Sequence, residues 1–293
     1  MDDRIIDVTA TEVRRALARS FVGGAVAEHT WRGRVGVGET EVCVDVEQDG
    51  ADTLVRARAS VLEDAALDAR RARLLLIENS ELLLGRFRHA GCEIVVEHAI
   101  LAGTTMDAVE VKASVWAVGW AAASFAPRLR ALLDEGTPPP PPPLPAGRLR
   151  DSADGVRFTD RRVQRLLEQR YGSFQHHPDW GYHGAFGSAR VFIDVLAVLD
   201  DSTAVRASSP VLSQIDLTDE LALHLHERSA EHACGAFLYV PARRELWFQH
   251  AVLGDDLDRV ELDAAVDLVA SVADGCDDEL RARFGGLRYA DLG

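Results

Sequence analysis

Histidines gather in the second half of the chain and raise the question of a metal site. His224, His226 and His232 lie within nine residues, and His176 and His177 are adjacent. His224 and His226 are two positions apart on an expected helix, so they point about 200° apart around its axis. Zinc sites instead favour ligands at chelating spacings. We therefore expect no metal and no cofactor, and a metal-dependent hydrolase stays an alternative.

Carboxylates offer a second route to catalysis. Asp45 and Asp194 recur inside strand-like segments of the two halves, and a carboxylate pair is able to do acid–base work. A catalytic pair needs supporting groups, and none is found, so a structural role is the preferred interpretation. The segment RVGVGET, residues 34–40, leads into another strand rather than a helix, which indicates a hairpin turn rather than a phosphate loop. The chain contains no GxSxG, HExxH or CxxC motif.

Aromatic residues are more informative about binding. Trp116 and Trp120 are four residues apart, so both rings lie on one face of an expected helix, and Phe125 follows in the same apolar run. This helix is either buried between the halves or exposed as a groove for a partner. Aromatic residues concentrate where proteins bind one another, so all three are candidate partner-binding residues.

A second aromatic set lies on an expected strand. Trp180, Tyr182 and Phe186 stand at two- and four-residue steps, which places them on one face of that strand. If that face is open, it is a platform for a peptide, and these residues are also partner-binding candidates.

A proline run divides the chain that carries these residues. Six consecutive prolines, Pro138–Pro143, favour a semi-rigid polyproline II spacer. A PxxP ligand for a partner domain is the alternative. We expect a first domain at residues 1–135, a proline-rich linker at 136–154 and a second domain at 155–293.

The two halves repeat one another. The spacing W-x6-G-x3-V-x2-DV begins at Trp31 and again at Trp180, and VRARASVL answers VRASSPVL. Aligning residues 103–135 with residues 254–286 without gaps gives 11 identities in 33 positions. An ordered series of matches along the whole length indicates an internal duplication.

The pattern in each half predicts the element order α-β-β-β-α-β-β-α. Valine-rich runs bounded by glycine or aspartate indicate strands, and apolar residues at three- and four-residue steps indicate helices. The expected helices are 11–20, 65–79, 160–171, 217–231 and one long terminal helix in each half. The expected strands begin with 31–37, 40–47 and 54–61 in the first half and with 180–186, 189–198 and 203–208 in the second. The fold class is α+β, with two tandem duplicated domains, each an antiparallel sheet packed with helices.

Composition restricts the partners. The formal net charge of −15 repels phosphate backbones, so we expect no nucleic acid. The longest apolar run, residues 114–126, is shorter than the ~20 residues of a membrane span, and no basic segment marks a signal peptide. Four scattered cysteines are typical of reduced, buried thiols. We expect a cytoplasmic protein without a membrane partner.

The element order, Asn79 near the end of the middle helix, the GRF and GAF strand starts, and the phrase HA-[IV]-L…G…D-x-VE together resemble a known superfamily. The chain is similar to YbjN-like proteins and class I type III secretion chaperones, and to actinobacterial proteins with tandem copies of that domain. The resemblance implies a non-enzymatic, chaperone-like adaptor that binds a client protein or peptide. It also implies a single-chain pseudo-dimer, present as a monomer or as a homodimer. A regulatory scaffold that dimerises through the Trp116–Trp120 helix remains a further alternative.

Overall fold

The computed structural model describes residues 3–35, 40–49, 52–102, 106–134, 136–140, 149–177, 181–198 and 202–292. Chain contacts divide the molecule into two compact units. The first contains residues 1–67 and 84–142, and the second contains residues 68–83 and 143–293. The second unit therefore includes a segment from the first half of the sequence.

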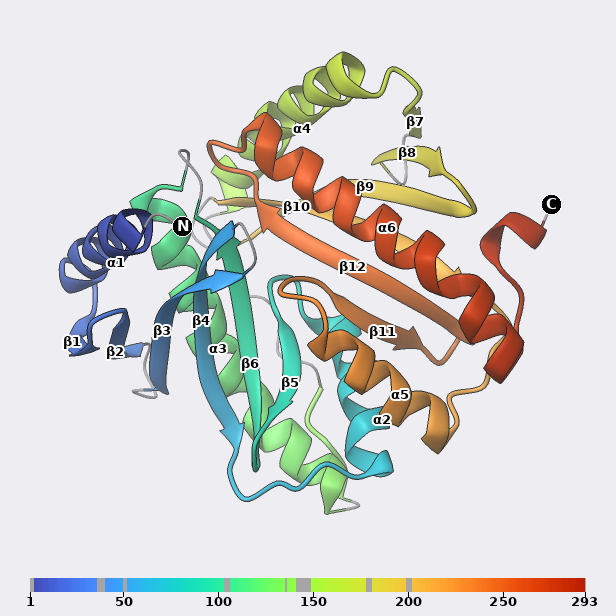
Figure 1. Ribbon diagram of the computed structural model, residues 1–293, viewed down its shortest axis with the longest axis horizontal. Helices are drawn as coiled ribbons and strands as arrows, with labels where there is room; N and C mark the ends of the chain where they lie inside the picture. The colour runs from blue at the N-terminus through green and yellow to red at the C-terminus, as the bar shows by residue number, and fades with distance from the viewer. Residues whose placement is uncertain are drawn as a thin grey trace. The chain divides into compact units, whose positions relative to one another are not determined.

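The first unit is a six-stranded antiparallel sheet with helices α1 (Asp3–Ala18) and α3 (Ala108–Leu133) (Figure 1). The strand order is β1-β2-β3-β4-β6-β5. The strands are β1 (Val22–Ala27), β2 (Thr30–Val35), β3 (Thr40–Asp49), β4 (Asp52–Leu62), β5 (Arg86–Ala90) and β6 (Glu93–Leu101). Helix α3 packs against β2, β3, β4 and β6, so one face of the sheet forms the core beneath it.

The second unit repeats this plan with the strand order β11-β12-β10-β9-β8-β7. Its strands are β7 (Gln175–His177), β8 (Gly181–Phe186), β9 (Ala189–Ala197), β10 (Thr203–Leu212), β11 (Ala236–Val240) and β12 (Glu245–Leu253). Its helices are α4 (Leu149–Arg170), α5 (Asp219–Ala230), α6 (Arg259–Phe284) and the short C-terminal η3 (Tyr289–Leu292). Helix α6 crosses β9, β10 and β12 (Figure 1). The α+β class and the two antiparallel sheets confirm the expected fold.

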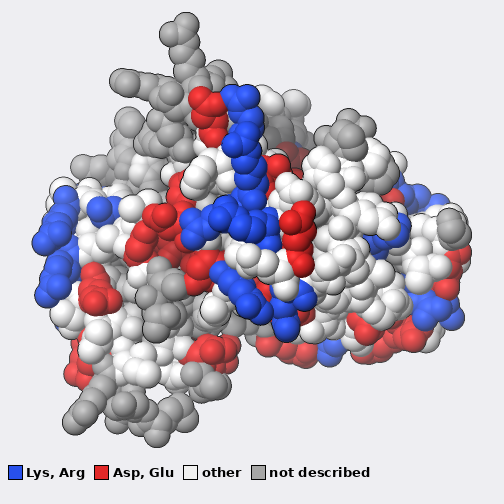
Figure 2. All heavy atoms as spheres, turned by 90° about the horizontal axis from the view of Figure 1, so that it is seen from above, with Lys and Arg blue, Asp and Glu red and all other residues white. Residues whose placement is uncertain are grey.

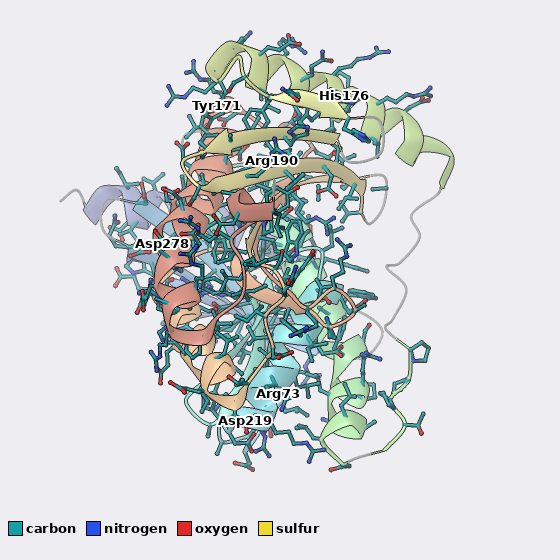
Figure 3. The ribbon with its side chains drawn as sticks, turned by 90° about the vertical axis from the view of Figure 1, so that its right-hand side faces the viewer. Arg73, Tyr171, His176, Arg190, Asp219 and Asp278 are labelled. Carbon is teal, nitrogen blue, oxygen red and sulfur yellow. The ribbon has the colours of Figure 1, made fainter. Side chains whose placement is uncertain are left out.

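The segment that joins the second unit from the first half is α2 (Ala69–Glu78) with the short helix η1 (Asn79–Glu81). Helix α2 packs against its counterpart α5 and against β11. Arg73 of α2 and Asp219 of α5 point toward one another, with Arg73 Nη1 3.2 Å from Asp219 Oδ1 (Figure 3). The two middle helices of the duplicated sequence therefore pack as a pair inside a single compact unit.

The repeated D-x-V-E phrase is a pair of helix N-caps. Asp107 accepts a hydrogen bond from the Glu110 amide (2.9 Å), and Glu110 accepts one from the Asp107 amide (3.1 Å). Asp258 and Glu261 form the same capping box at 2.8 Å in both directions. Each box satisfies backbone N–H groups that a helix start leaves without partners. This requirement accounts for the phrase that opens both terminal helices.

The structure differs from expectation in the number of strands, in where two helices begin and in the burial of one cysteine. Each sheet has one more strand than expected, β1 in the first unit and β7 in the second. Helix α1 begins at Asp3 rather than residue 11, and α4 begins at Leu149 rather than residue 160. Cys92 is exposed, so the expectation of uniformly buried thiols is wrong, although Cys276 is buried.

Strands β2 and β3 pair antiparallel from Val35 and Thr40 outward, in keeping with the expected hairpin, while residues 36–39 lie outside the described part.

Within the described residues, no helix combines the length and apolar character that crossing a bilayer demands.

Candidate peptide-binding groove

The second sheet has a face that α6 does not cover. Strand alternation turns Val205 and Ala207 of β10 toward the core, where they are at most 1% exposed. Their neighbours Arg206 and Ser208 point to the opposite face and are half-buried. This face contains a groove of about 690 Å³. It is lined by Ser80, Phe192, Asp194, Arg206, Ser208, Leu238, Val240, Arg243, Glu245, Trp247, Gln249 and Tyr289.

Three aromatic rings give the groove its apolar character. Phe192 of β9 and Trp247 of β12 lie with their ring centroids 5.9 Å apart. Tyr289 of η3 meets Phe192 edge to face at 6.0 Å. The Arg190 guanidinium lies 5.9 Å from the centre of the Tyr289 ring and supports that wall from β9 (Figure 3). Offset and edge-to-face arrangements are the favourable geometries for aromatic pairs, so the three rings stabilise one another in the groove wall.

The charged groups of the groove pair with one another. Arg206 donates to both oxygens of Asp194, from Nε at 3.0 Å and from Nη2 at 2.6 Å. Glu245 accepts from Trp247 Nε1 at 2.9 Å and lies 3.6 Å from Arg243 Nη1. Two arginines thus balance two carboxylates, although the whole chain carries a net charge of −15. On the molecular face drawn in Figure 2, acidic and basic side chains are likewise intermixed.

Helix η1 packs against β11 and contributes Ser80 to the lining of the groove. Asn79 donates from Nδ2 to the Phe237 carbonyl at 3.1 Å. Gln249 donates from Nε2 to the carbonyls of Asn79 at 3.3 Å and Leu82 at 3.4 Å. These bonds fix Ser80, the next residue along, at the groove wall.

The corresponding face of the first unit has different chemistry. In the duplication, Cys43 stands opposite Phe192, Val95 opposite Trp247 and Glu97 opposite Gln249. Glu97, which is 3% exposed, accepts from Arg86 at 2.7 Å and from Arg56 at 3.2 Å. Burial by itself raises the pKa of Glu97, but the charges of Arg86, Arg56 and Arg88 outweigh it and hold that pKa below its ordinary value. The aromatic groove therefore belongs to the second unit alone among the described residues.

The candidates from the terminal helix α3 lie in the first unit. Trp116 and Trp120 are half-buried. Phe125 is fully buried and packs against Phe87 at 5.3 Å and Trp120 at 6.4 Å. Phe125 therefore belongs to the core of the first unit, whereas part of each tryptophan side chain is exposed to solvent.

The candidates from β8 do not line the groove. Tyr182 is 3% exposed, and its hydroxyl donates to the Asp160 carbonyl at 3.3 Å. Phe186 packs with Tyr171 at 5.5 Å and Phe174 at 5.9 Å, and Trp180 lies outside the described residues. Sequence reasoning missed Phe192, Trp247 and Tyr289. The alternation of VFIDV and LWFQH carried a signal for the two strand residues, because it turns Phe192 and Trp247 away from the buried side.

The polar candidates have structural partners. Asp45 accepts from the Thr30 hydroxyl at 2.7 Å and pairs with Arg58 at 2.9 Å, and Asp194 pairs with Arg206. These contacts agree with the structural interpretation of both aspartates. Within the described residues, the one group of three His, Cys, Asp or Glu side chains close enough to share an ion is Asp7, Glu28 and His29. It lies in the first half, not among the second-half histidines.

Comparison with known proteins agrees with this architecture. Residues 157–292 match the family model TY-Chap1, described as "T3SS (YopN, CesT) and YbjN peptide-binding chaperone 1". The match covers α6, the whole second sheet and most of α4. No curated protein matches the chain. Residues 157–292 are thus similar to the YbjN and type III secretion peptide-binding chaperones that this family model describes.

Proposed function

We propose that the protein is a non-enzymatic, chaperone-like adaptor that holds an extended segment of a client protein in the groove of its second unit. The observation that carries the proposal is the aromatic wall of Phe192, Trp247 and Tyr289 on a sheet face that α6 leaves open. The peptide-binding description of the matching family supports the same role.

The charge balance of the groove indicates what it accepts. Its arginines are paired with its carboxylates, so a charged client side chain gains no free partner there and loses its hydration. An uncharged aliphatic or aromatic side chain gains contact with the rings without that cost. A volume of about 690 Å³ is within the usual range for ligand sites, about 300–1,000 Å³. The proposed client segment is therefore apolar and locally uncharged.

We further propose that the chain is a single-chain pseudo-dimer. Two sheets with the same strand plan and the packing of α2 against α5, which are equivalent helices of the duplication, support this proposal. Domain boundaries at residues 135 and 155 then mark the duplicated sequence, whereas segment 68–83 of the first copy belongs to the second compact unit.

Binding of short labelled peptides, followed by fluorescence polarisation, tests the function. Wild type should bind an uncharged leucine- and phenylalanine-rich peptide more tightly than the same peptide with every second residue replaced by aspartate. Trp247→Ala should weaken binding by a factor of roughly 10 to 30, as expected for loss of a buried aromatic anchor worth about 2 kcal/mol. The matched control is Trp116→Ala/Trp120→Ala on the first unit, which should bind like wild type. Equal binding by wild type and Trp247→Ala contradicts the groove, and loss only in the control moves the site to α3.

A further inference from the structure

A turn in the second unit encloses a carboxylate of α6. Asp274 accepts hydrogen bonds at Oδ1 from the Ser188 amide (2.5 Å) and the Ser188 hydroxyl (2.8 Å). Gly187, with φ of +56°, makes room for this carboxylate, because a Cβ there would collide with it. The pKa of Asp274 is lowered, first by the hydrogen bond from the Ser188 hydroxyl and then by that from its amide. Asp274 is therefore ionised at neutral pH.

A second carboxylate lies one helical turn further along. Asp277 Oδ2 is 2.6 Å from the same Ser188 hydroxyl oxygen. Asp277 is only 4% exposed, and its Oδ1 is buried without a hydrogen-bond partner among the described residues. A buried carboxylate oxygen left without a partner is costly, and such atoms are rare in folded proteins.

The Ser188 hydroxyl has too few protons for the carboxylate oxygens of Asp274 and Asp277 that surround it. The Ser188 hydroxyl has one proton, yet one oxygen of each carboxylate approaches it, Asp274 Oδ1 at 2.8 Å and Asp277 Oδ2 at 2.6 Å, so it donates to only one of them at a time. Arg288 is close enough for its pKa to be raised by Asp277, after the larger effect of its hydrogen bond to Asp291. Its guanidinium already donates to Asp278 and Asp291, at 2.7 and 2.9 Å. Among the residues that the structure describes, no basic side chain therefore forms an ion pair with Asp274 or Asp277.

We propose that Asp274, Asp277 and the Ser188 hydroxyl bind a hard divalent cation that ties α6 to the turn between β8 and β9. All the atoms offered to the cation are oxygens, which are the ligands that Ca²⁺ and Mg²⁺ prefer, whereas softer transition metals favour nitrogen and sulfur. A cation bound between the two side chains supplies a partner for Oδ1 of Asp277 and offsets the negative charge of Asp274. Asp274 is exposed, so water completes the coordination from that side.

The duplication supplies its own comparison. Ala123 and Ala126 of α3 stand at the positions of Asp274 and Asp277 in the aligned terminal helices. The fold thus accepts alanine at both positions, and the two aspartates are not required to pack the helix on its sheet. The proposed site belongs to the second unit only.

Isothermal titration of the chelator-treated full chain with CaCl2 and, separately, MgCl2 tests the site. Wild type should show one saturable site for at least one of these ions. Asp274→Ala/Asp277→Ala, which copies the first half, should lose it. Asp277→Asn should lose it while staying folded, because its amide donates to Ser188. The control Asp278→Ala/Glu279→Ala removes two neighbouring charges from α6 and should keep the binding.

Thermal unfolding provides the second readout. At an ion concentration about 100-fold above Kd, the transition of wild type should rise by roughly 5 to 10 °C, and that of Asp277→Asn should not respond. The proposal is overturned if no saturable binding occurs up to about 10 mM, well above the weakest calcium modules. It is also overturned if Asp277→Asn binds as wild type does.

Discussion

The side-chain amide of Asn79 donates to the backbone carbonyl of Phe237, 158 positions further along the chain, over 3.1 Å. Asn79 ends the middle helix of the first copy, and Phe237 lies on β11 in the second copy. Gln249 of the neighbouring strand donates back to the Asn79 carbonyl. These two hydrogen bonds add to the packing of α2 on α5 and β11, and together they hold residues 68–83 in the second unit with Ser80 at its groove.

Asn79→Ala should destabilise the second unit by about 1–3 kcal/mol, because it leaves the buried Phe237 carbonyl without this donor. Arg73→Ala is the matched control from the same segment. It breaks an exposed ion pair with Asp219 and should cost no more than about 1 kcal/mol. Hydrogen exchange of the α5 and β11 amides, with urea unfolding, measures both effects. Equal protection in the two variants would show that the junction contributes nothing to this unit.

Glu97 predicts how the first unit responds to acid. Its folded pKa is depressed, so its contribution to stability is present above the unfolded pKa and is lost as pH falls through the folded value. Urea unfolding of the first unit should therefore become easier below about pH 4.5, near the ordinary pKa of a glutamate. Burial lowers the pKa of Arg86 more than its pairing with Glu97 raises it, yet a guanidinium stays protonated throughout this range.

Glu97→Gln should cost roughly 3–5 kcal/mol at pH 7, because it leaves Arg86 and Arg56 with a neutral partner in a buried site. It should also flatten the acid response of the first unit between pH 2 and pH 5. Asp45→Asn, at the more exposed pair with Arg58, is the control and should leave that response largely intact. An unchanged pH profile in Glu97→Gln would assign the acid response to other carboxylates.

The sequence contained enough to predict the two sheets, because duplication doubled each signal and valine-rich runs mark strands beneath a helix. It did not reveal β1. The residues of VGGAVA are exposed at all six positions, so no alternation of buried and exposed side chains marks this strand. Two glycines also lower its strand propensity. β7 has three residues, too few to show a period.

The groove was harder to predict, for two physical reasons. Helix α2 buries one apolar face. The sequence pattern of that face is the same whether the helix packs on the sheet of its own half or on α5, so the pattern does not identify the packing partner. Tyr289 reaches Phe192 only because the chain after α6 turns back along β10, where Leu287 pairs with Ser213. Contacts of this kind depend on tertiary packing, whereas Trp116 and Trp180 are conspicuous by residue type alone.

Thiol reactivity should separate the cysteines by burial. Burial raises the pKa of Cys276 to about 12, so almost no thiolate forms at pH 8. Cys92 is exposed and should react with a thiol reagent within minutes in the native state. Mass spectrometry of peptides after native labelling distinguishes them, and Cys92→Ser is the control for the fast phase. Rapid native labelling of Cys276 would mean that α6 opens from its sheet.

Trp120 and Phe125 separate folding from binding on α3. Phe125 is fully buried against Phe87, so Phe125→Ala should destabilise the first unit by roughly 3–5 kcal/mol. Trp120 is half-buried, so Trp120→Ala should cost clearly less, because part of the indole is already in contact with water. Urea unfolding of the two variants measures the difference. If Trp120→Ala proves as damaging as Phe125→Ala, both residues serve the core, and α3 then offers no surface that competes with the groove at Trp247 for the client.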